Sequence, residues 1–329
     1  MDKYEDSKQR IVQLTSQYDR ILGDHQVSIG AEALLEGISS PRLDTDGQRQ
    51  RFAVFAQEDW TVTERLELLP GVRFDLDSQF GQQLSPKASF RLTPFGPIVL
   101  RGGYGRGFRA PGFRELLLRF ENIGVGYEVV GNLDLQPERS HGFTLDLEMA
   151  ASRSVVGHIG AFYNTVDNLI TIDLVDEQTG LTTYSYINIE QAMSRGGEAG
   201  VSFTPGEVEI SLGYALTDTL DVELDRPLPG RALHRGNVSL QLPIEPITAE
   251  VSGRARLVGQ QVFFADTNGD DVEDAIYTDP YVSLDLRAEK QVVATLSGLA
   301  GVNNLLDAGD ASLLPLEPRQ LYVGLSGQF

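Results

Sequence analysis

Apolar and polar residues alternate with a period of two along most of the chain. In 142–149, 247–259 and 319–329 the apolar residues fall mainly on odd positions, and in 207–217 they fall on even ones. This period is that of a β-strand with one apolar face, whereas an amphipathic helix repeats every 3.6 residues. No long segment has the helical period, and only 112–120 is expected to form a short helix. The pattern therefore predicts an all-β chain.

The alternating segments predict about fifteen strands. These are 9–21, 25–36, 50–60, 64–76, 85–93, 97–107, 139–151, 154–174, 182–204, 207–218, 232–243, 247–263, 280–289, 291–304 and 319–329. Several are long for a soluble protein. At about 3.3 Å per residue, the segment 247–263 is expected to exceed the thickness of a membrane.

The connections between these strands alternate between short and long. The short ones are 22–24, 61–63, 94–96, 152–153, 205–206, 244–246 and the region around 290. The long ones are 37–49, 77–84, 108–138, 175–181, 219–231, 264–279 and 305–318. Outer-membrane barrels have tight turns on the periplasmic rim and long loops on the external rim. The alternation therefore predicts a transmembrane antiparallel β-barrel, located in the cell outer membrane.

Composition excludes several classes of protein. The 329 residues contain no cysteine and carry a net charge of −20, which argues against a nucleic-acid partner. The charge is explained either by solubility or by an acidic external rim. No apolar run is long enough for a transmembrane helix, and the first ten residues, MDKYEDSKQR, lack the apolar core of a secretory signal.

The connection from Gly102 to Glu148 combines glycine, arginine, aromatic residues and turn formers, and a connection this long is usually functional or disordered. It contains FRAP at 108–111, Glu115-Leu116, and GNLDLQPE at 131–138. In this it resembles TonB-dependent outer-membrane receptors, in which a strand ending in fRAP…eL precedes a loop closing on G-N-x-x-L-x-P-E.

Four more segments resemble the same family. They are the hairpin at 52–75, the strand at 184–203, GVNNLLDAGD at 301–310 and the closing strand at 318–329. In the family the closing strand, here with Tyr322 and Phe329, is recognised by the barrel-assembly machinery. Trp60 and Tyr322 are candidates for interfacial aromatic girdles, or equally for ordinary core or surface aromatics.

The resemblance implies an incomplete protein. Family members carry a signal peptide, a TonB-contacting box and a plug domain before a barrel of twenty-two strands. Residues 1–329 match only part of the barrel domain, starting near its eighth strand, and contain no plug. The chain is therefore expected to be a C-terminal fragment, which would reach TonB only through a missing N-terminal region. Its other expected partners are outer-membrane lipids, the assembly machinery and a small-molecule ligand.

The long connection also holds the candidate ligand-binding residues. These are Tyr104, Arg106, Phe108, Arg109, Phe113 and Arg114. Guanidinium groups and aromatic faces suit anionic, partly aromatic ligands such as metal chelates. The resemblance implies that the region lies at the outer, inward-facing end of the barrel, where ligand and plug meet. Alternatively, the arginines pair with carboxylates in the lumen or on the plug.

A second candidate site is the acidic segment 266–274. Asp266, Asn268 and Asp270 have the first three spacings of a calcium-binding loop, but the sixth position is Asp271 instead of Gly and the twelfth is Tyr277 instead of Glu. The alternative is an acidic, solvated external loop. No other cofactor is indicated.

Three functions were weighed. The first is active import of a scarce nutrient, such as a ferric siderophore or cobalamin, by a TonB-dependent receptor. The second is a plugless barrel that acts as a surface-binding protein, adhesin or phage receptor without transport. The third, an enzymatic barrel, lacks a recognisable constellation, because the four histidines are scattered and no G-x-S-x-G or H-E-x-x-H is present. The sequence therefore predicts a receptor and no enzyme.

Overall fold

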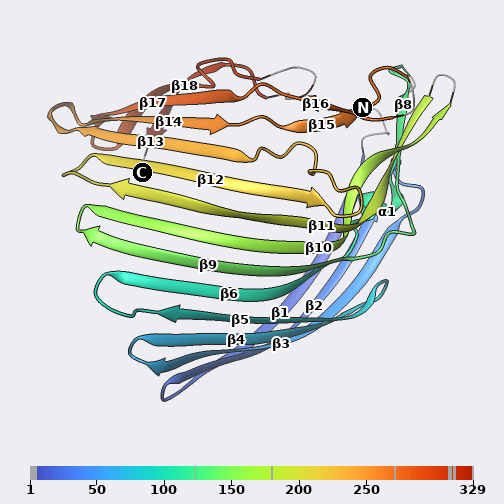
Figure 1. Cartoon of the computed structure of the whole chain (residues 1–329), viewed down its shortest axis with the longest axis horizontal. Helices are drawn as coiled ribbons and strands as arrows, with labels where there is room; N and C mark the ends of the chain where they lie inside the picture. Colours follow the sequence, from blue (N-terminus) through green and yellow to red (C-terminus); the bar gives the residue numbers. More distant parts are fainter. Residues whose placement is uncertain are drawn as a thin grey trace.

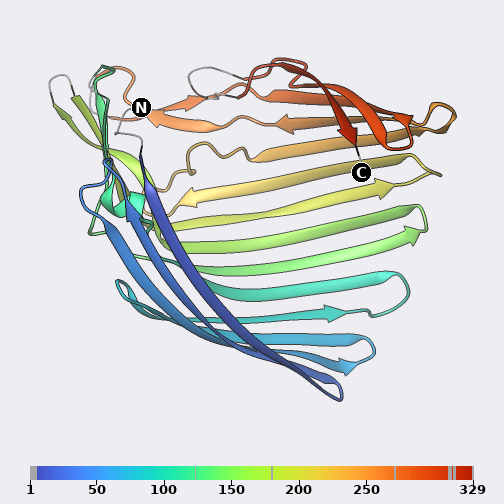
Figure 2. The same ribbon diagram turned by 180° about the vertical axis from the view of Figure 1, so that it is seen from behind.

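The structure is a computed structural model, and it describes residues 6–122, 124–178, 181–269, 272–309, 313 and 316–327. One curved sheet of 17 strands dominates it, with a separate two-stranded hairpin (Figures 1 and 2). None of the helices in the described part of the chain has the length and apolar character needed to cross a membrane.

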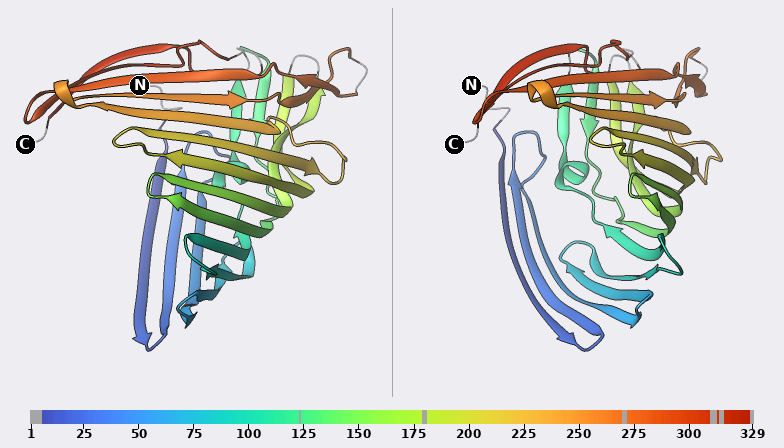
Figure 3. Two further views of the ribbon diagram at one scale, coloured as in Figure 1. Left: turned by 60° about the vertical axis from the view of Figure 1, so that its left-hand side comes forward. Right: turned by 90° about the vertical axis from the view of Figure 1, so that its left-hand side faces the viewer.

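Fifteen strands form an antiparallel meander, as the alternation predicted. They are β1 (Lys8–Leu22), β2 (His25–Ser39), β3 (Gly47–Thr63), β4 (Leu66–Asp77), β5 (Gly81–Leu92), β6 (Ile98–Arg109), β9 (Glu138–Ser152), β10 (Val155–Gln178), β11 (Leu181–Phe203), β12 (Glu209–Asp221), β13 (His234–Ile244), β14 (Ala249–Val258), β17 (Tyr281–Val293), β18 (Leu296–Asn303) and β19 (Gln320–Gly327). Each pairs with the next in this order. Within the described residues β1 pairs only with β2 and β19 only with β18, so the sheet does not close (Figure 3).

Four short strands were not predicted. β7 (Arg119–Asn122) and β8 (Tyr127–Val130) form a hairpin, and β8 also pairs in parallel with β11. β15 (Val262–Ala265) and β16 (Asp274–Tyr277) form the separate hairpin. A helix, α1 (Phe113–Leu117), lies within the expected range 112–120, and a single 3-10 turn, η2 (Glu245–Ile247), joins β13 to β14.

The prediction of one strand over 247–263 is wrong. The ladder of β14 ends at Val258, and residues 262–265 pair with β16 instead of with β13 or β17. The backbone N–H of Gly259 donates to the carbonyl of His234 at 2.8 Å, and a Cβ on Gly259 would lie 3.1 Å from that same oxygen. This glycine therefore allows the chain to pass close to β13 and leave the sheet.

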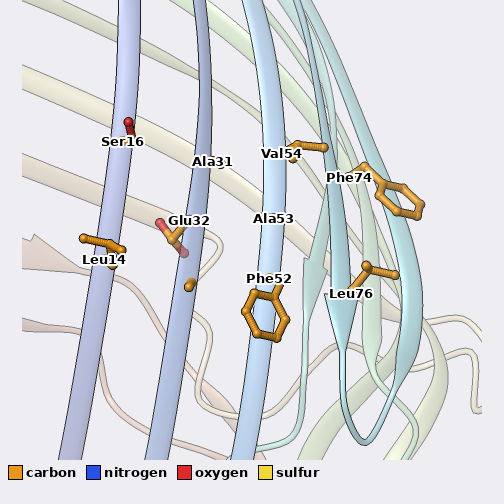
Figure 4. A pocket seen from close by; sticks show the side chains of 10 residues that line it. Leu14, Ser16, Ala31, Glu32, Phe52, Ala53, Val54, Phe74 and Leu76 are labelled. Atoms are coloured by element: carbon orange, nitrogen blue, oxygen red, sulfur yellow. The ribbon is translucent and has the colours of Figure 1, made fainter.

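The two faces of the sheet differ in chemistry. The outer face carries exposed apolar side chains, among them Leu14, Phe52, Val54, Leu76, Leu84, Leu145, Ile159, Leu212, Val238, Val251, Leu257, Leu286, Val323 and Leu325. Figure 4 shows a hollow on this face that Leu14, Phe52, Val54, Phe74 and Leu76 help to line. Water would leave this much apolar surface poorly solvated, whereas a lipid bilayer would cover it.

Charged residues line the concave face. The α1 helix lies on this side, within the curve of the sheet (Figure 3). Arg51 contacts Glu36, Arg73 contacts Glu32 and Asp75, and Arg101 contacts Asp146 and Glu148, at 3.0–3.4 Å. Asp146 and Glu148, which the alternation placed on the polar face, are thus part of a ladder of ion pairs.

The strands are tilted, as they must be in a barrel. Followed sideways from strand to strand, one row of outer-face residues runs from Trp60 near the end of β3, through Phe90 and Leu145, to His234 at the start of β13. Trp60 is near a short turn and His234 follows a long connection (Figure 1). The row therefore climbs from one rim to the other, and the short and long connections lie on opposite rims as predicted.

Candidate functional site

The long connection 110–137 folds against the concave face, and Arg109 holds its two ends together. Its guanidinium donates to Glu138 at 2.6 and 2.5 Å, from Nε to Oε2 and from Nη2 to Oε1. Its Nη1 donates to both oxygens of Glu115 at 2.9 and 3.0 Å. Two-point pairing of this kind fixes direction as well as distance. Arg109 thus joins the last residue of β6 to the first residue of β9 and to α1.

Both carboxylates also accept backbone hydrogen bonds. Glu115 accepts from the N–H of Gly112 at 2.5 Å, which caps the first turn of α1. Glu138 accepts from the N–H of Ile170 on β10 at 2.9 Å. Removing Arg109 would therefore leave two carboxylates without their cation while they remain fixed by the backbone.

The segment 131–137 is built for close packing. A Cβ on Gly131 would lie 2.5 Å from the backbone nitrogen of Leu117, so no larger residue fits without moving the main chain. The side chain of Asn132 donates to the carbonyl of Tyr186 at 2.9 Å, and its own N–H donates to the carbonyl of Glu115 at 2.8 Å. Leu135 is only 2% exposed. We call the structure formed by residues 109–117 and 131–138 the mouth clasp.

One member of the clasp environment was missed by the sequence analysis. Arg49 on β3 is 5% exposed and donates to the carbonyl of Pro111 at 2.5 Å and to Gln79 at 2.9 Å. Its guanidinium carbon lies 5.4 Å from the ring centre of Phe80 and 5.0 Å from that of Phe113. The sequence placed Arg49 in the long connection 37–49, just before the predicted strand, and gave no sign of its partners, which are 30 residues or more away.

The six predicted ligand-binding residues do not converge on one face. Arg109, Phe113 and Arg114 belong to the clasp on the concave side. Tyr104, Arg106 and Phe108 are the even positions of β6, and the register sets Tyr104 opposite Phe143 on the apolar outer face. Strand alternation makes this separation unavoidable. The tyrosine hydroxyl lies 2.9 Å from Nδ1 of His141, and the two rings stack.

Around the clasp the concave side presents aromatic and cationic groups. Phe120 on β7 and Tyr127 on β8 have ring centres 6.0 Å apart, and Arg42 lies over Phe120 at 5.3 Å. Arg119 already has partners: it donates a hydrogen bond to Glu121 at 3.3 Å and lies 3.5 Å from Asp44. These two carboxylates raise its pKa above the ordinary value. The guanidinium of Arg114 is exposed and forms no ion pair or hydrogen bond with any described residue.

The calcium prediction is only partly covered by the structure. Asp266 and Asn268 lie between β15 and β16, and Asp270 lies outside the described residues. Asp266 accepts from the N–H groups of Asn268 and Gly269 at 3.1 and 2.7 Å, as in an ordinary turn. The described residues contain no group of three or more potential metal ligands. Calcium binding stays a prediction.

The structure describes only one of the two residues of the expected assembly signal. Phe329 lies outside the described residues, so its role stays a prediction. Tyr322 is on β19 opposite Gly301, and its ring covers that glycine on the side of Arg287. Of the two alternatives for Tyr322, the register therefore favours an ordinary aromatic over a lipid-facing girdle, because Leu321 and Val323 take the outward positions. Trp60 does lie on the outer face, stacked on His25 at 5.5 Å between ring centres.

An apolar outer face, a charged concave face and a clasped connection at one rim define the barrel of an outer-membrane receptor. A family model described as TonB dependent receptor-like, beta-barrel, matches residues 7–305. The chain belongs to this family, as the resemblance of its motifs indicated. The family is one of transporters and receptors located in the outer membrane rather than of enzymes.

Two curated relatives are iron-related. The chain is 29% identical over 211 residues to the iron-regulated outer membrane virulence protein of Vibrio cholerae, a match that covers 60% of the chain and 32% of the relative. It is 22% identical over 325 residues to the ferrienterobactin receptor of Escherichia coli, covering 92% of the chain and 42% of the relative. The chain thus spans less than half the length of either relative.

Solved structures show the same fold. The ferric enterobactin receptor of Pseudomonas aeruginosa superposes with a TM-score of 0.78 at 20% identity, covering 98% of this chain and 54% of that one. A siderophore receptor of Acinetobacter baumannii gives 0.79 at 16% identity, with 98% and 55% coverage. These similarities show that the chain shares the β-barrel fold of the two solved chains, and that it spans just over half the length of each.

Proposed function

We propose that the protein to which this chain belongs imports an anionic, aromatic ferric siderophore across the outer membrane in a TonB-dependent manner. The observation that carries this proposal is the guanidinium of Arg114 at the clasp, which has no ion-pair or hydrogen-bond partner among the described residues, in a chain of net charge −20. The names of the two relatives support iron as the cargo.

The groups around Arg114 suit such a ligand. A ferric catecholate is a delocalised anion with aromatic faces. Both a guanidinium group and aromatic rings would therefore stabilise it when bound. The positive charge of Arg114 acts electrostatically on Tyr186. The rings of Phe120 and Tyr127, on the β7–β8 hairpin, have centres 6.0 Å apart. Arg109 is excluded from this role, because two carboxylates already occupy its guanidinium. Binding would hence depend on Arg114 and its aromatic neighbours.

Uptake in the source organism tests the proposal. Cells grown under iron limitation, with the gene intact or deleted in frame, would be given ⁵⁵Fe complexed with a catecholate, a hydroxamate or citrate. We expect the deletion to abolish energy-dependent uptake of the catecholate complex alone. An Arg114→Gln allele should weaken that uptake about tenfold, while Arg195→Gln, which changes an arginine already paired with Asp218 at 2.9 Å, should leave it unchanged.

The plugless surface-binding protein makes a different prediction. It would bind a ligand equally well with and without a protonophore and would accumulate no iron inside the cell. Unchanged uptake of all three complexes in the deletion strain would show that iron is the wrong cargo. Cobalamin uptake would then be the next measurement on the same strains.

A further inference from the structure

Three residues with basic side chains meet on the outer face, at the end of the sheet that carries the long connections. Arg106 on β6 is directly opposite His141 on β9, and Phe108 is opposite Arg139. Directly opposite residues have Cβ atoms about 5 Å apart, whereas Arg106 and Arg139 are diagonal neighbours, at a spacing of about 7–8 Å. Strand alternation sets all of them on the same face as Phe143 and Leu145, away from the concave side. We call the two arginines, Arg106 and Arg139, which flank His141 on this face, the outer cation cluster.

The two arginines of this cluster have no partner in the part of the chain that the structure describes. Neither guanidinium forms an ion pair or hydrogen bond within the described part of the chain. Asp167 is opposite Arg139 on β10, but its carboxylate accepts from Gln191 at 2.9 Å. By contrast Arg195, another outward-facing arginine, is paired with Asp218. In a chain with 47 acidic and only 27 basic residues, two neighbouring arginines without a partner among the described residues indicate an anion from outside the chain.

The height of the cluster matches a membrane interface. Arg139 lies ten residues before Met149, which is near the short turn that ends β9. Ten residues extend about 33 Å, and a strand tilt of about 40° reduces this to about 25 Å, the height of the apolar band of an outer-membrane barrel. Tyr104 and Phe143, with ring centres 4.8 Å apart, lie one row below the cluster. Aromatic residues of this kind mark the headgroup level.

An apolar hollow continues down the same face. It is lined in part by Leu147, Met149, Ile159, Val201 and Tyr214, from β9 to β12. Acyl chains could lie in this hollow while a headgroup reaches the cations above it. Cations, an aromatic belt and an apolar hollow in this vertical order match an amphiphile with a phosphorylated head.

We propose that the outer cation cluster binds the phosphate groups of a phosphorylated glycolipid in the outer leaflet. The planar guanidinium group presents its N–H donors in a fork that pairs with phosphate at two points, and two arginines on neighbouring strands match a headgroup with two phosphates. The external position follows from the long connections, which mark the outer rim. This surface is separate from the ligand mouth, because it lies on the opposite face of the sheet.

Native mass spectrometry of the full chain in detergent tests the proposal. The probes are diphosphoryl lipid A, its dephosphorylated form and phosphatidylglycerol. We expect the wild-type chain to retain the diphosphoryl lipid at least tenfold more tightly than either other lipid. Arg106→Gln combined with Arg139→Gln should lose that preference, and Arg195→Gln, the matched control on the same face, should keep it.

Several outcomes would overturn the proposal. Equal retention of the diphosphoryl and dephosphorylated lipids by the wild-type chain would do so without any variant. So would equal retention of phosphatidylglycerol, or complete displacement by 10 mM inorganic phosphate, since a free ion would then suffice. If the double glutamine variant fails to fold, Arg106→Lys with Arg139→Lys keeps the charge, and it should retain the lipid with only a partial loss of affinity.

Discussion

Arg106 and Arg109 are three residues apart on the same strand and have opposite environments. Arg109 faces the concave side and is held by Glu115 and Glu138, whereas Arg106 faces outward among aromatic residues and pairs with none of the residues that the structure describes. The sequence analysis had grouped both as ligand-binding residues because of their side-chain chemistry and their place in one long connection. The difference shows that in a barrel strand, odd and even positions face opposite sides of the wall. Whether a side chain faces the lumen or the lipid is therefore set by its position, whatever its chemical type.

The largest effect on the clasp should come from Gly131→Val. Its side chain would meet the backbone of Leu116 and Leu117 at 2.5–2.6 Å, so relief requires main-chain movement and should cost more than about 3 kcal/mol locally. We expect protease cleavage within 110–137 to become at least tenfold faster in detergent. Gly105→Ala is the control, since the nearest atom to its Cβ is 4.0 Å away, and equal cleavage of both variants would contradict the packing described here.

Leu135→Ala should cause the second-largest loss of stability in the clasp. The side chain is 2% exposed, and removing it should cost about 2–4 kcal/mol of local stability. Hydrogen exchange of the amides in 131–138 would report this as faster opening of the clasp. Leu133→Ala, at a position 74% exposed, should change exchange little. If both variants behave alike, the clasp is not a packed unit.

Arg109→Gln and Arg106→Gln test the two faces directly. Loss of Arg109 should cost about 1–2 kcal/mol, a value reduced for its 46% exposed side chain. Exchange of the Gly112 and Ile170 amides, which donate to its carboxylate partners, should become about tenfold faster. Arg106→Gln should shift stability by no more than about 0.5 kcal/mol. A larger effect from Arg106 would show that the outward face contributes to folding.

The smallest effect is expected from the ladder of ion pairs below the clasp. Arg101→Gln removes contacts to Asp146 and Glu148, but these side chains are 34–43% exposed, and such pairs contribute about 0–1 kcal/mol. Thermal denaturation should differ from wild type at 50 mM NaCl and converge with it at 1 M, where charges are screened. A difference that persists at 1 M would point to packing instead of charge.

The sequence predicted the fifteen long strands well, because each repeats its apolar positions often enough to define a period. It missed β7, β8, β15 and β16, since four residues cannot display a period and their partners are set by the folded sheet. The error over 247–263 has a similar origin: alternation continues past Val258, but the pairing with β13 and β17 ends there and the chain leaves the sheet. The role of Arg49 could not be predicted, because Pro111 and Phe113 reach it only when the connection folds back.

The separation of Tyr104 and Arg106 from Arg109 follows from the sequence, because even and odd positions of one strand face opposite sides. Residues 100–109 alternate strictly enough to place Arg109 on the side of Arg101 and Gly103. The family motif, in contrast, is read along the chain and ignores the face. What the sequence lacked was the identity of the partner groups, Glu115 and Glu138, which identify Arg109 as a structural residue of the clasp.

Trp60 is the single tryptophan of the chain, and its place on the outer face makes it an intrinsic optical probe. The indole is 36% exposed, close to the rim with the short turns, and stacked on His25. Insertion into a bilayer would move its emission to shorter wavelength, and brominated lipids would quench it according to the depth of the bromine. Because Trp60 marks one rim only, the side from which a quencher acts would also report which way the barrel had inserted, without any label.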